Sequence, residues 1–389
     1  MRRVLFVNRY FHPDHSATSQ MLSDLAFHLA VRGWPVEVIT SRQRYDDASA
    51  RLPAEETVQG VRIHRVMTSR FGRGFLPGRA LDYATFYLAA FFSLLHHSDR
   101  QTIIVAKTDP PLVSVVAASV ALFTGSKLVN WIQDLFPEVA ESLGVTRRVG
   151  MLRRLRNWSL RRASTNVAIS EEMAARLAMT NVEVRENWAD AGINPCDRDE
   201  NPLRTAWQLN DAFVVGYSGN LGRAHDGAAL LESMRALPAV TFLVIGGGAQ
   251  SAGLRQDAAA LPNVRFEPYQ PREMLSQSLS AADVHLVTLL PSLEGLIVPS
   301  KIYGILAAGR PAIYIGSPDS TIGRLLLENE CGLVADPDQA GSLPWCIAKL
   351  AQNQSLAGSM GRRGRALYER RFTPTIAFAE WERILSAVK

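Results

Sequence analysis

Two short stretches in the second half of the chain combine glycines with cationic side chains. Residues 216–227, GYSGNLGRAHDG, follow an apolar run and precede a helical pattern. A glycine-bearing turn at the start of a helix presents backbone N–H groups, which suit a phosphate. Gly219 and Gly222 permit close approach, while Arg223 and His225 add donors or positive charge. The stretch predicts a phosphate site, although an ordinary strand-to-helix turn has the same composition.

The second stretch, residues 291–311, places a serine and a lysine at the start of an apolar helical pattern. A lysine at a helix start opposes the helix dipole unless it faces an anion. Lys301 is also one of only five lysines in the chain. Together with Ser300 and the preceding Glu294–Gly295 loop, it predicts an anion site. The alternative is a solvated lysine whose aliphatic stem lies along the surface.

Two further stretches follow predicted strands. Residues 244–250, VIGGGAQ, have three glycines that suit a base or a phosphate near Gly247, and turn geometry explains them equally well. Residues 127–138, KLVNWIQDLFPE, place Asp134 and Glu138 past a strand end, where ligands bind in α/β domains. Their spacing suits one helix face, but the proline between them favours a loop or a first helical turn. An N-cap role for Asp134 is the structural alternative.

These candidate residues lie within a repeated alternation of short apolar runs and helical patterns. A helix is predicted over 17–32, where leucines and a methionine recur at helical spacing before Gly33. The apolar runs predict buried strands at 3–8, 36–40, 61–66, 103–106, 127–132, 165–169, 213–218, 240–245, 264–266, 284–289, 312–315 and 332–335. The alternation predicts an α/β protein with two doubly wound parallel sheets.

A turn-rich stretch divides the two halves. Residues 187–202 are rich in Asn, Asp, Pro and Gly, so the boundary is expected there. The predicted organisation is a first domain over 1–190, a linker over 191–202, a second domain over 203–373, and a terminal helix over 374–389. Facing sheets of this kind hold ligands beyond the carboxyl ends of their strands.

The composition is that of an ordinary globular protein. The chain has 389 residues, of which 47% are hydrophobic and 20% charged, so disorder is excluded. Three cysteines without a C-x-x-C pattern indicate neither a disulfide framework nor a zinc site, and no metal is expected. The first residues read as a strand rather than a signal peptide. A cytoplasmic protein is therefore expected.

The positive charge is concentrated in the first half. Residues 1–190 contain 24 Lys and Arg against 18 Asp and Glu, whereas residues 191–389 contain 18 against 19. Residues 146–164 hold seven arginines, from Arg147 to Arg162, and no acid. With apolar residues at helical spacing, this stretch predicts an amphipathic helix on an anionic membrane surface. A nucleic-acid patch and a solvated helix packed by its apolar stripe are the alternatives.

One apolar segment is too short to span a membrane. Residues 81–95 are 15 apolar-rich positions that include an aspartate, whereas spanning needs roughly 20 residues. A buried helix, or one that dips partly into a membrane, is predicted.

Taken in order, the motifs resemble glycosyltransferase family four, especially the O-antigen, capsule and exopolysaccharide branch that includes fucosamine transferases. The resemblance covers nearly the whole chain. It rests on NRYFHPDHSATSQ, WIQDLFPE, YSGNLGRAHDG, VIGGG, VPSKIYGILAAGRP and ECGLVADP. It implies the GT-B fold, with two facing Rossmann-like domains and the terminal helix crossing back to the first. It also implies transfer with retention of anomeric configuration, without a metal or a cofactor, from a nucleotide sugar, with a UDP-sugar favoured.

The resemblance also implies roles for individual residues. Asp134, or Gln133 beside it, occupies the approximate place of a first-domain His-Asp pair that faces the sugar. In the second domain, the resemblance implies that Gly219, Asn220, Gly222 and Arg223 bind the donor diphosphate and that Ser300 and Lys301 bind the leaving phosphate. Glu294 and Gly295 would lie near the transferred sugar. Glu267 and Tyr269 would lie near the base.

The sequence departs from the family pattern at the second domain. Many members have two glutamates with seven residues between them. If Glu294 is the first glutamate, the position of the second is occupied by Ile302. If the sequence is aligned instead on the AAGRP motif, the second glutamate corresponds to Gly304. The usual Arg and Lys of the glycine turn correspond to Asn220 and His225. The carboxylate that binds the ribose is therefore missing, and Arg223 and Lys301 are inferred as substitutes for the family's usual Arg and Lys.

The expected function is sugar transfer to a polyprenyl-diphosphate-linked glycan at the inner face of the cytoplasmic membrane. An epimerase, or another enzyme that does not transfer the sugar, is the alternative on the same fold. A nucleic-acid-binding protein is disfavoured because no nucleic-acid motif accompanies the arginines.

Overall fold

The computed structural model describes residues 2–388 except 46, 48, 73–75, 146–148 and 210. The chain forms two compact units, residues 1–186 with 377–389 and residues 187–376. Residues 191–202, expected as a linker, belong to the second unit. There the backbone N–H groups of Asn194 and Cys196 donate to the hydroxyls of Ser276 and Ser280.

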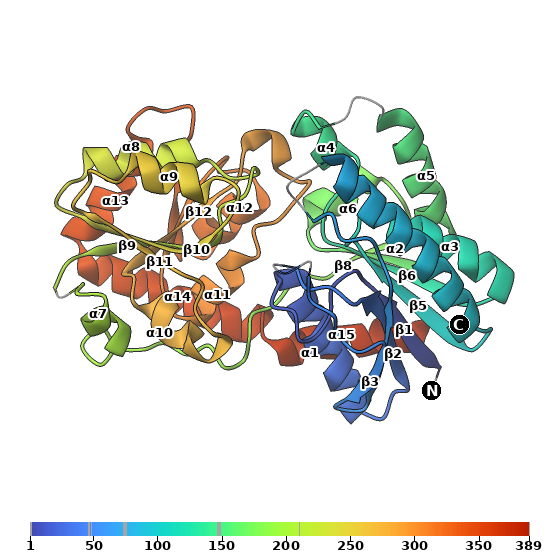
Figure 1. The fold of residues 1–389 in the computed structure, drawn as a ribbon. Helices are drawn as coiled ribbons and strands as arrows, with labels where there is room; N and C mark the ends of the chain where they lie inside the picture. The colour runs from blue at the N-terminus through green and yellow to red at the C-terminus, as the bar shows by residue number, and fades with distance from the viewer. Residues whose placement is uncertain are drawn as a thin grey trace. The chain divides into compact units, whose positions relative to one another are not determined.

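The first unit is an eight-stranded sheet with helices on both faces (Figure 1). Its elements are β1 Arg3–Val7, α1 Ala17–Val31, β2 Val36–Ser41, β3 Glu55–Val58, β4 Val61–Val66, α2 Leu76–His97, β5 Thr102–Lys107, α3 Val113–Thr124, β6 Lys127–Ile132, α4 Glu138–Ser142, α5 Val149–Arg162, β7 Thr165–Ala168, α6 Glu171–Leu177 and β8 Val182–Val184. The strand order is β3-β4-β2-β1-β5-β6-β7-β8, and only the β3–β4 pair is antiparallel.

The second unit is a six-stranded parallel sheet, also covered by helices (Figure 1). Its elements are α7 Pro202–Ala206, β9 Val214–Asn220, α8 Gly227–Ala236, β10 Thr241–Gly247, α9 Ser251–Asp257, β11 Val264–Glu267, α10 Leu275–Ser280, β12 Val284–Thr288, α11 Lys301–Ala307, β13 Ala312–Ile315, α12 Thr321–Glu328, β14 Gly332–Ala335, α13 Ser342–Gln352 and α14 Gln354–Arg371. The order β11-β10-β9-β12-β13-β14 is that of a doubly wound Rossmann-like sheet.

The last helix, α15 Pro374–Ala387, has most of its length in the first unit. Trp381 is buried with its ring 4.7 Å from that of Trp131 on β6. His28 of α1 lies 2.7 Å from the Glu382 carboxylate. These contacts bury the apolar face of α15 against the first sheet and α1, which accounts for the helical pattern at the end of the sequence.

The predicted α/β class with two parallel sheets is confirmed, and all twelve predicted strands are present. The prediction omitted the edge strands β3 and β8. β3 alternates exposed and half-buried residues, and β8 has three half-buried ones, so neither forms the buried apolar run that marks a central strand. Within the described residues, no helix is long and apolar enough to cross a membrane.

Candidate active site

The strand order of the second unit creates a switch point between β9 and β12. Helices connect in opposite directions from these neighbouring strands, and α/β domains of this kind bind ligands beyond the carboxyl ends of such a strand pair. Strands β9 and β10 end together there, with Gly219 opposite Gly246 and Asn220 opposite Gly247. The two glycine stretches singled out in the sequence therefore meet at one edge of the sheet.

The glycines at this edge are required by close packing. A Cβ on Gly246 would lie 2.5 Å from the Gly219 carbonyl oxygen, and Gly246 has φ +121°. A Cβ on Gly248 would lie 2.5 Å from the Asn220 side-chain oxygen. Since neither position can hold a side chain, backbone groups form the floor of this edge.

Lys301 lies beside this floor at the start of α11. Its Nζ is 3.6 Å from the centroid of the Tyr217 ring, and its Cε is 3.9 Å from where a Gly219 Cβ would be. Although the stem is partly exposed, Nζ is buried and has no hydrogen-bond partner among the described residues. Burial lowers the pKa of Lys301 to about 7. A buried ammonium without a hydrogen-bond partner favours an anion, and the backbone groups of the glycine edge lie beside it.

Two neighbouring groups extend the polar character of the site. The Ser218 hydroxyl is also buried without a hydrogen-bond partner among the residues described. His225 Nδ1 donates to the Thr288 carbonyl oxygen at 2.6 Å, since a carbonyl can only accept. Burial, with a smaller effect from Lys301, lowers the pKa of His225 to about 4. The imidazole is therefore neutral and keeps Nε2 as an acceptor.

The loop before α11 is fixed through Glu294. Its carboxylate accepts hydrogen bonds from the Tyr314 hydroxyl at 2.9 Å and the Ser317 backbone N–H at 2.8 Å. Gly295 follows in the left-handed region with φ +73°. Ser300 precedes α11 as its N-cap residue, and its side chain makes no capping hydrogen bond. Glu294 thus ties the loop that leads to Lys301 to the end of β13.

The remaining predicted residues of the second unit lie around the same strand ends. Tyr269 follows β11 with 54% of its surface exposed, and its ring lies 3.4 Å from where a Gly247 Cβ would be. Glu267 ends β11 and is half-buried, while Gly222 and Arg223 lie in the β9–α8 turn, with the arginine exposed. The Gly304 position faces Leu279 of α10 and Ile193.

The first unit has its own switch point, between β1 and β5. Lys107 ends β5 with no exposed surface, its Nζ lies 3.5 Å from the Trp131 ring centroid, and no described residue accepts a hydrogen bond from it. Burial lowers its pKa well below the usual value, and the nearby carboxylates of Asp24, Asp109 and Asp134 oppose that effect. The sequence analysis missed Lys107. The available signal was a rare lysine at the end of a buried strand.

Asp134 lies past the end of β6, in the same region. Burial, together with Asp109, raises its pKa to about 6, and Lys107 acts in the opposite direction. A small cavity of about 30 Å³, room for about one water molecule, is lined by Lys107, Asp134 and Asn130 among others. Asp134 precedes α4, whose N-cap is Pro137, so the N-cap alternative is wrong. The Gln133 backbone N–H donates to the Thr108 hydroxyl at 2.7 Å.

The structure therefore gathers Gly219, Asn220, Gly247, Tyr269 and Lys301 at one sheet edge, with Glu294 and Ser300 in the adjoining loop. Asp134 belongs to the other unit, where it shares the β1–β5 end with Lys107. The Asp134 carboxyl, whose pKa lies near neutrality, suits proton transfer. The buried Lys301 ammonium beside backbone amides suits the binding of a polyphosphate.

Known proteins resemble both units. A glycosyl transferase 4-like domain matches residues 17–186, and a glycosyl transferases group 1 domain matches residues 212–353. The probable glycosyltransferase WbjE of Pseudomonas aeruginosa is 24% identical over 314 residues, covering 77% of this chain and 78% of that protein. The putative colanic acid biosynthesis glycosyl transferase WcaI of Escherichia coli strain K12 is 26% identical over 354 residues, covering 83% and 85%.

Among solved structures, Alr3699/HepE of Anabaena in complex with UDP-glucose has the same fold. The TM-score is 0.74 at 17% sequence identity, and the superposition covers 100% of both chains. The likeness extends over both units.

Proposed function

Because its two halves match glycosyl transferase domains and its two Rossmann-like domains form the GT-B fold, we propose that the chain is a glycosyltransferase that transfers a sugar from a nucleotide sugar to a lipid-linked glycan. In this proposal the sugar is a hexose or an N-acetylhexosamine, fucosamine among them, and it retains its anomeric configuration. A UDP-sugar donor is supported by the HepE structure, which holds UDP-glucose. A role in polysaccharide biosynthesis is supported by the name of WcaI, a putative colanic acid biosynthesis glycosyl transferase. The acceptor in this proposal is a polyprenyl-diphosphate-linked glycan of a surface polysaccharide.

The observation that carries the proposal is the buried ammonium of Lys301 beside the glycine edge, for which the described part of the chain offers no hydrogen-bond partner. Sugar transfer breaks the bond between the anomeric carbon and the diphosphate, and its electron pair goes to the leaving oxygen. A preorganised cation and backbone N–H groups stabilise that charge most in a site shielded from water. In this proposal the acceptor hydroxyl attacks on the face from which the diphosphate leaves, so no protein nucleophile is needed, and Lys301 rather than a metal neutralises the leaving diphosphate.

Asp134 is proposed to act as the general base for the acceptor hydroxyl. Its pKa of about 6 leaves a carboxylate at neutral pH that can still take a proton. It would accept the proton of the attacking hydroxyl as the new glycosidic bond forms. In this scheme the Gly219–Asn220 edge and Lys301 hold the diphosphate, and Tyr269 stacks on the base.

A thermal-shift screen over UDP-, GDP- and dTDP-sugars tests the donor proposal. A UDP-sugar is expected to stabilise the protein selectively, by about 2.7 kcal/mol when its concentration is 100 times Kd. Selective stabilisation by a GDP- or dTDP-sugar would contradict the UDP assignment, and no stabilisation by any of them would contradict nucleotide-sugar binding altogether.

Peripheral association with the inner face of the cytoplasmic membrane is also proposed, and an exposed apolar face on the first unit supports it. Helices α2, α3 and α5 lie side by side, as Figure 1 shows. Their large exposed apolar side chains are Leu88 (62%), Phe92 (60%), Phe123 (75%) and Met151 (67%), with Leu81, Leu95, Leu122 and Leu155 between 38% and 53%. So many large apolar groups on adjacent helices suit a lipid surface.

The arginine stretch contributes less charge to this face than its sequence suggests. Arg156 is buried and binds the Glu138 carboxylate at 2.8 Å, and Arg153 binds it at 3.0 Å. Arg154, Arg161 and Arg162 of α5 are exposed and can face anionic headgroups. Arg147 and Arg148 lie outside the described residues. The membrane proposal therefore rests on apolar side chains as much as on charge.

Replacing Leu88, Phe92 and Phe123 together by serine is expected to lower partitioning onto phosphatidylglycerol-containing vesicles by at least about tenfold, because each side chain would bury apolar surface in the lipid. Vesicle co-sedimentation measures the change. Trp345→Ser is the matched control, since Trp345 is 60% exposed but lies in the second unit. Equal partitioning of the triple variant and the wild type would contradict this surface.

A further inference from the structure

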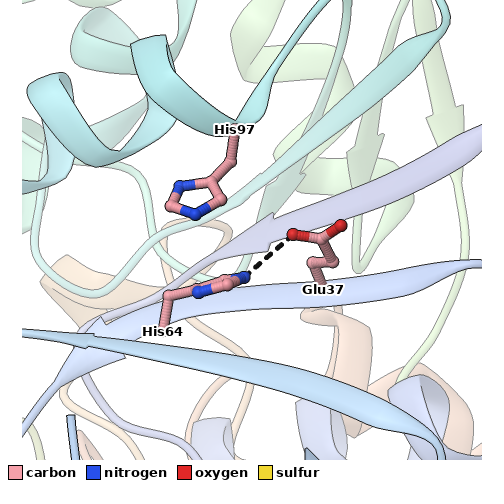
Figure 2. A group of neighbouring side chains, drawn as sticks. All are labelled: Glu37, His64 and His97. Atoms are coloured by element: carbon pink, nitrogen blue, oxygen red, sulfur yellow. Dashed lines mark hydrogen bonds and ion pairs between the residues drawn. The ribbon is translucent and has the colours of Figure 1, made fainter. Parts of the chain in front are cut away.

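Three metal-ligating side chains meet at the end of α2, away from the candidate active site. Glu37 of β2, His64 of β4 and His97 of α2 each offer a ligand atom, and these atoms lie within 4.8 Å of one another (Figure 2). The residues are 27 and 33 positions apart along the sequence, so no motif predicted the group. Glu37 is the second residue of β2, whereas Asp134 follows the carboxyl end of β6, so the group lies at the opposite end of the sheet.

The two imidazoles are held in forms that can bind a metal. His97 Nδ1 donates to the Ser93 carbonyl oxygen at 2.8 Å, which leaves the lone pair of Nε2 available. His64 Nε2 donates to Glu37 Oε2 at 2.9 Å, and His64 Nδ1 is buried without a hydrogen-bond partner among the described residues. The centroids of the two rings are 4.0 Å apart.

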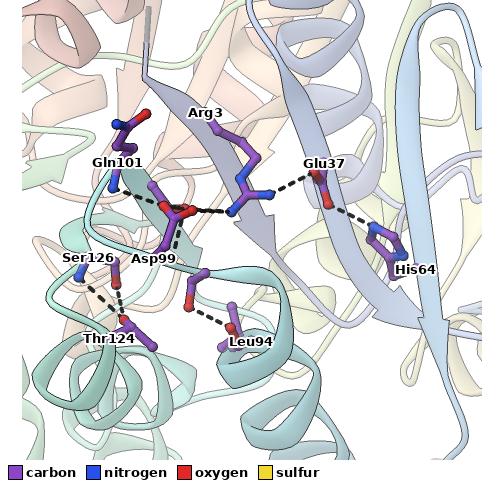
Figure 3. A network of polar contacts seen from close by, with 10 residues as sticks. Arg3, Glu37, His64, Leu94, Asp99, Gln101, Thr124 and Ser126 are labelled. Carbon is purple, nitrogen blue, oxygen red and sulfur yellow. Dashed lines mark hydrogen bonds and ion pairs between the residues drawn. The ribbon is translucent and has the colours of Figure 1, made fainter.

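The carboxylate is fixed by the surrounding polar network. Arg3 donates to Glu37 Oε1 at 3.4 Å and is itself held by Asp99 at 3.3 Å and the Thr102 hydroxyl at 3.0 Å (Figure 3). Hydrogen bonds from Arg3 and His64 therefore fix the orientation of the Glu37 carboxylate, as outer contacts commonly do for metal-binding carboxylates.

We propose that Glu37, His64 and His97 bind a zinc ion that joins α2 to the sheet. Two imidazoles and one carboxylate form a ligand set typical of Zn²⁺, with a water molecule as the fourth ligand. Ligand atoms about 2.0–2.1 Å from a tetrahedral ion are about 3.3 Å apart, so the His64–Glu37 pair must open by a few tenths of an ångström. The ion takes the place of the proton on His64 Nε2, and the ring carries its proton on Nδ1 instead, which has no hydrogen-bond partner among the described residues. The His97 ring turns its Nε2 toward the ion.

The position at the end of α2 favours a cation. The last carbonyl groups of this 22-residue helix carry partial negative charge, and His97 is its final residue. Since the ion would lie at the end of the sheet away from Asp134, its role is structural and the transfer reaction does not require it. The bond network links β2 and β4 to the helix that carries Leu88 and Phe92.

Zinc titration of the metal-free full-length protein tests the site. One Zn²⁺ per chain is expected to bind in calorimetry and to raise Tm by at least about 3 °C. Co²⁺ in its place should give the visible absorption bands of a four-coordinate ion. His97→Ala and His64→Ala are expected to abolish the Tm shift and the Co²⁺ bands. Because His97 is only half-buried, its variant keeps the fold, which the Tm without metal verifies.

His28→Ala is the matched control. His28 Nε2 lies 2.7 Å from the Glu382 carboxylate, but this pair belongs to no metal-ligating group of three within the part of the chain that the structure describes. The control should keep the full zinc response. A wild-type Tm that zinc does not change, or a His97→Ala variant that keeps the response, would overturn the proposal and leave the group as an Arg3–Glu37–His64 ion network.

Discussion

Replacing Lys301 by alanine is expected to lower kcat/KM for sugar transfer by about 10²–10³-fold, the effect of removing one group that stabilises developing charge in a shielded site. The Lys301 ammonium is buried beside the glycine edge and has no hydrogen-bond partner among the described residues, so the donor diphosphate is its expected counter-ion. The measurement is the initial rate of transfer at several donor concentrations. The Tm of the variant should change little, because no described residue accepts a hydrogen bond from this ammonium and its burial carries a desolvation cost.

Lys349→Ala is the matched control for this substitution. Lys349 also places its Nζ over an aromatic ring, 4.9 Å from the Trp345 centroid, but it is exposed on α13. Its replacement should leave the transfer rate unchanged. Turnover by Lys301→Ala close to that of the wild type would remove the lysine from the phosphate site.

The same lysine gives donor binding a pH dependence. Burial lowers the pKa of Lys301 to about 7, so its ammonium form is lost as the pH rises through that value. A bound diphosphate favours the charged form. Affinity for the nucleotide sugar should therefore fall above about pH 7, by up to about tenfold per pH unit, and Lys301→Ala should lose this dependence.

Replacing Asp134 by asparagine is expected to lower kcat by about 10²–10⁴-fold, the usual contribution of a positioned general base. Burial and Asp109 raise the pKa of this carboxyl to about 6. A base acts only when it is deprotonated, so wild-type activity should fall about tenfold per pH unit below about pH 6 and level off above it. Asp134→Asn should abolish this acidic limb while donor binding stays intact.

Gln133→Ala tests whether Asp134 or the neighbouring Gln133 is responsible for the pH dependence. The Gln133 backbone N–H is already held by the Thr108 hydroxyl, and the replacement keeps that bond. The variant is expected to retain the acidic limb of the pH profile. Loss of the limb in Gln133→Ala, with Asp134→Asn close to wild type, would reverse the assignment.

The fold could be predicted because its signals are local. Buried parallel strands appear as short β-branched apolar runs, and turn residues separate them from helical patterns. The edge strands β3 and β8 carry no such run, so they escaped the prediction. The glycines at the ends of β9 and β10 were visible because close strand packing excludes side chains there.

The candidate site was visible only where a single stretch of sequence marks its residues. Lys301 stood out as a rare lysine at a helix start, but the burial of Lys107 depends on Trp131, 24 positions later in the sequence. Arg156 read as part of a basic surface because its partner Glu138 lies 18 residues upstream. Likewise Glu37, His64 and His97 meet only through the strand order and the end of α2. These residues escaped the prediction because their partners are distant in sequence, and local patterns do not encode such tertiary contacts.

The most direct test of the central claim is NMR analysis of the product formed from a nucleotide sugar and a polyprenyl-diphosphate-linked glycan. The account predicts a lengthened lipid-linked glycan whose new linkage has the anomeric configuration of the donor. An inverted linkage would contradict retention. If the glycan stays unchanged while the nucleotide sugar is epimerised, the result would contradict transfer itself and support an epimerase on this fold. Epimerised nucleotide sugar in a reaction without acceptor would support the same conclusion.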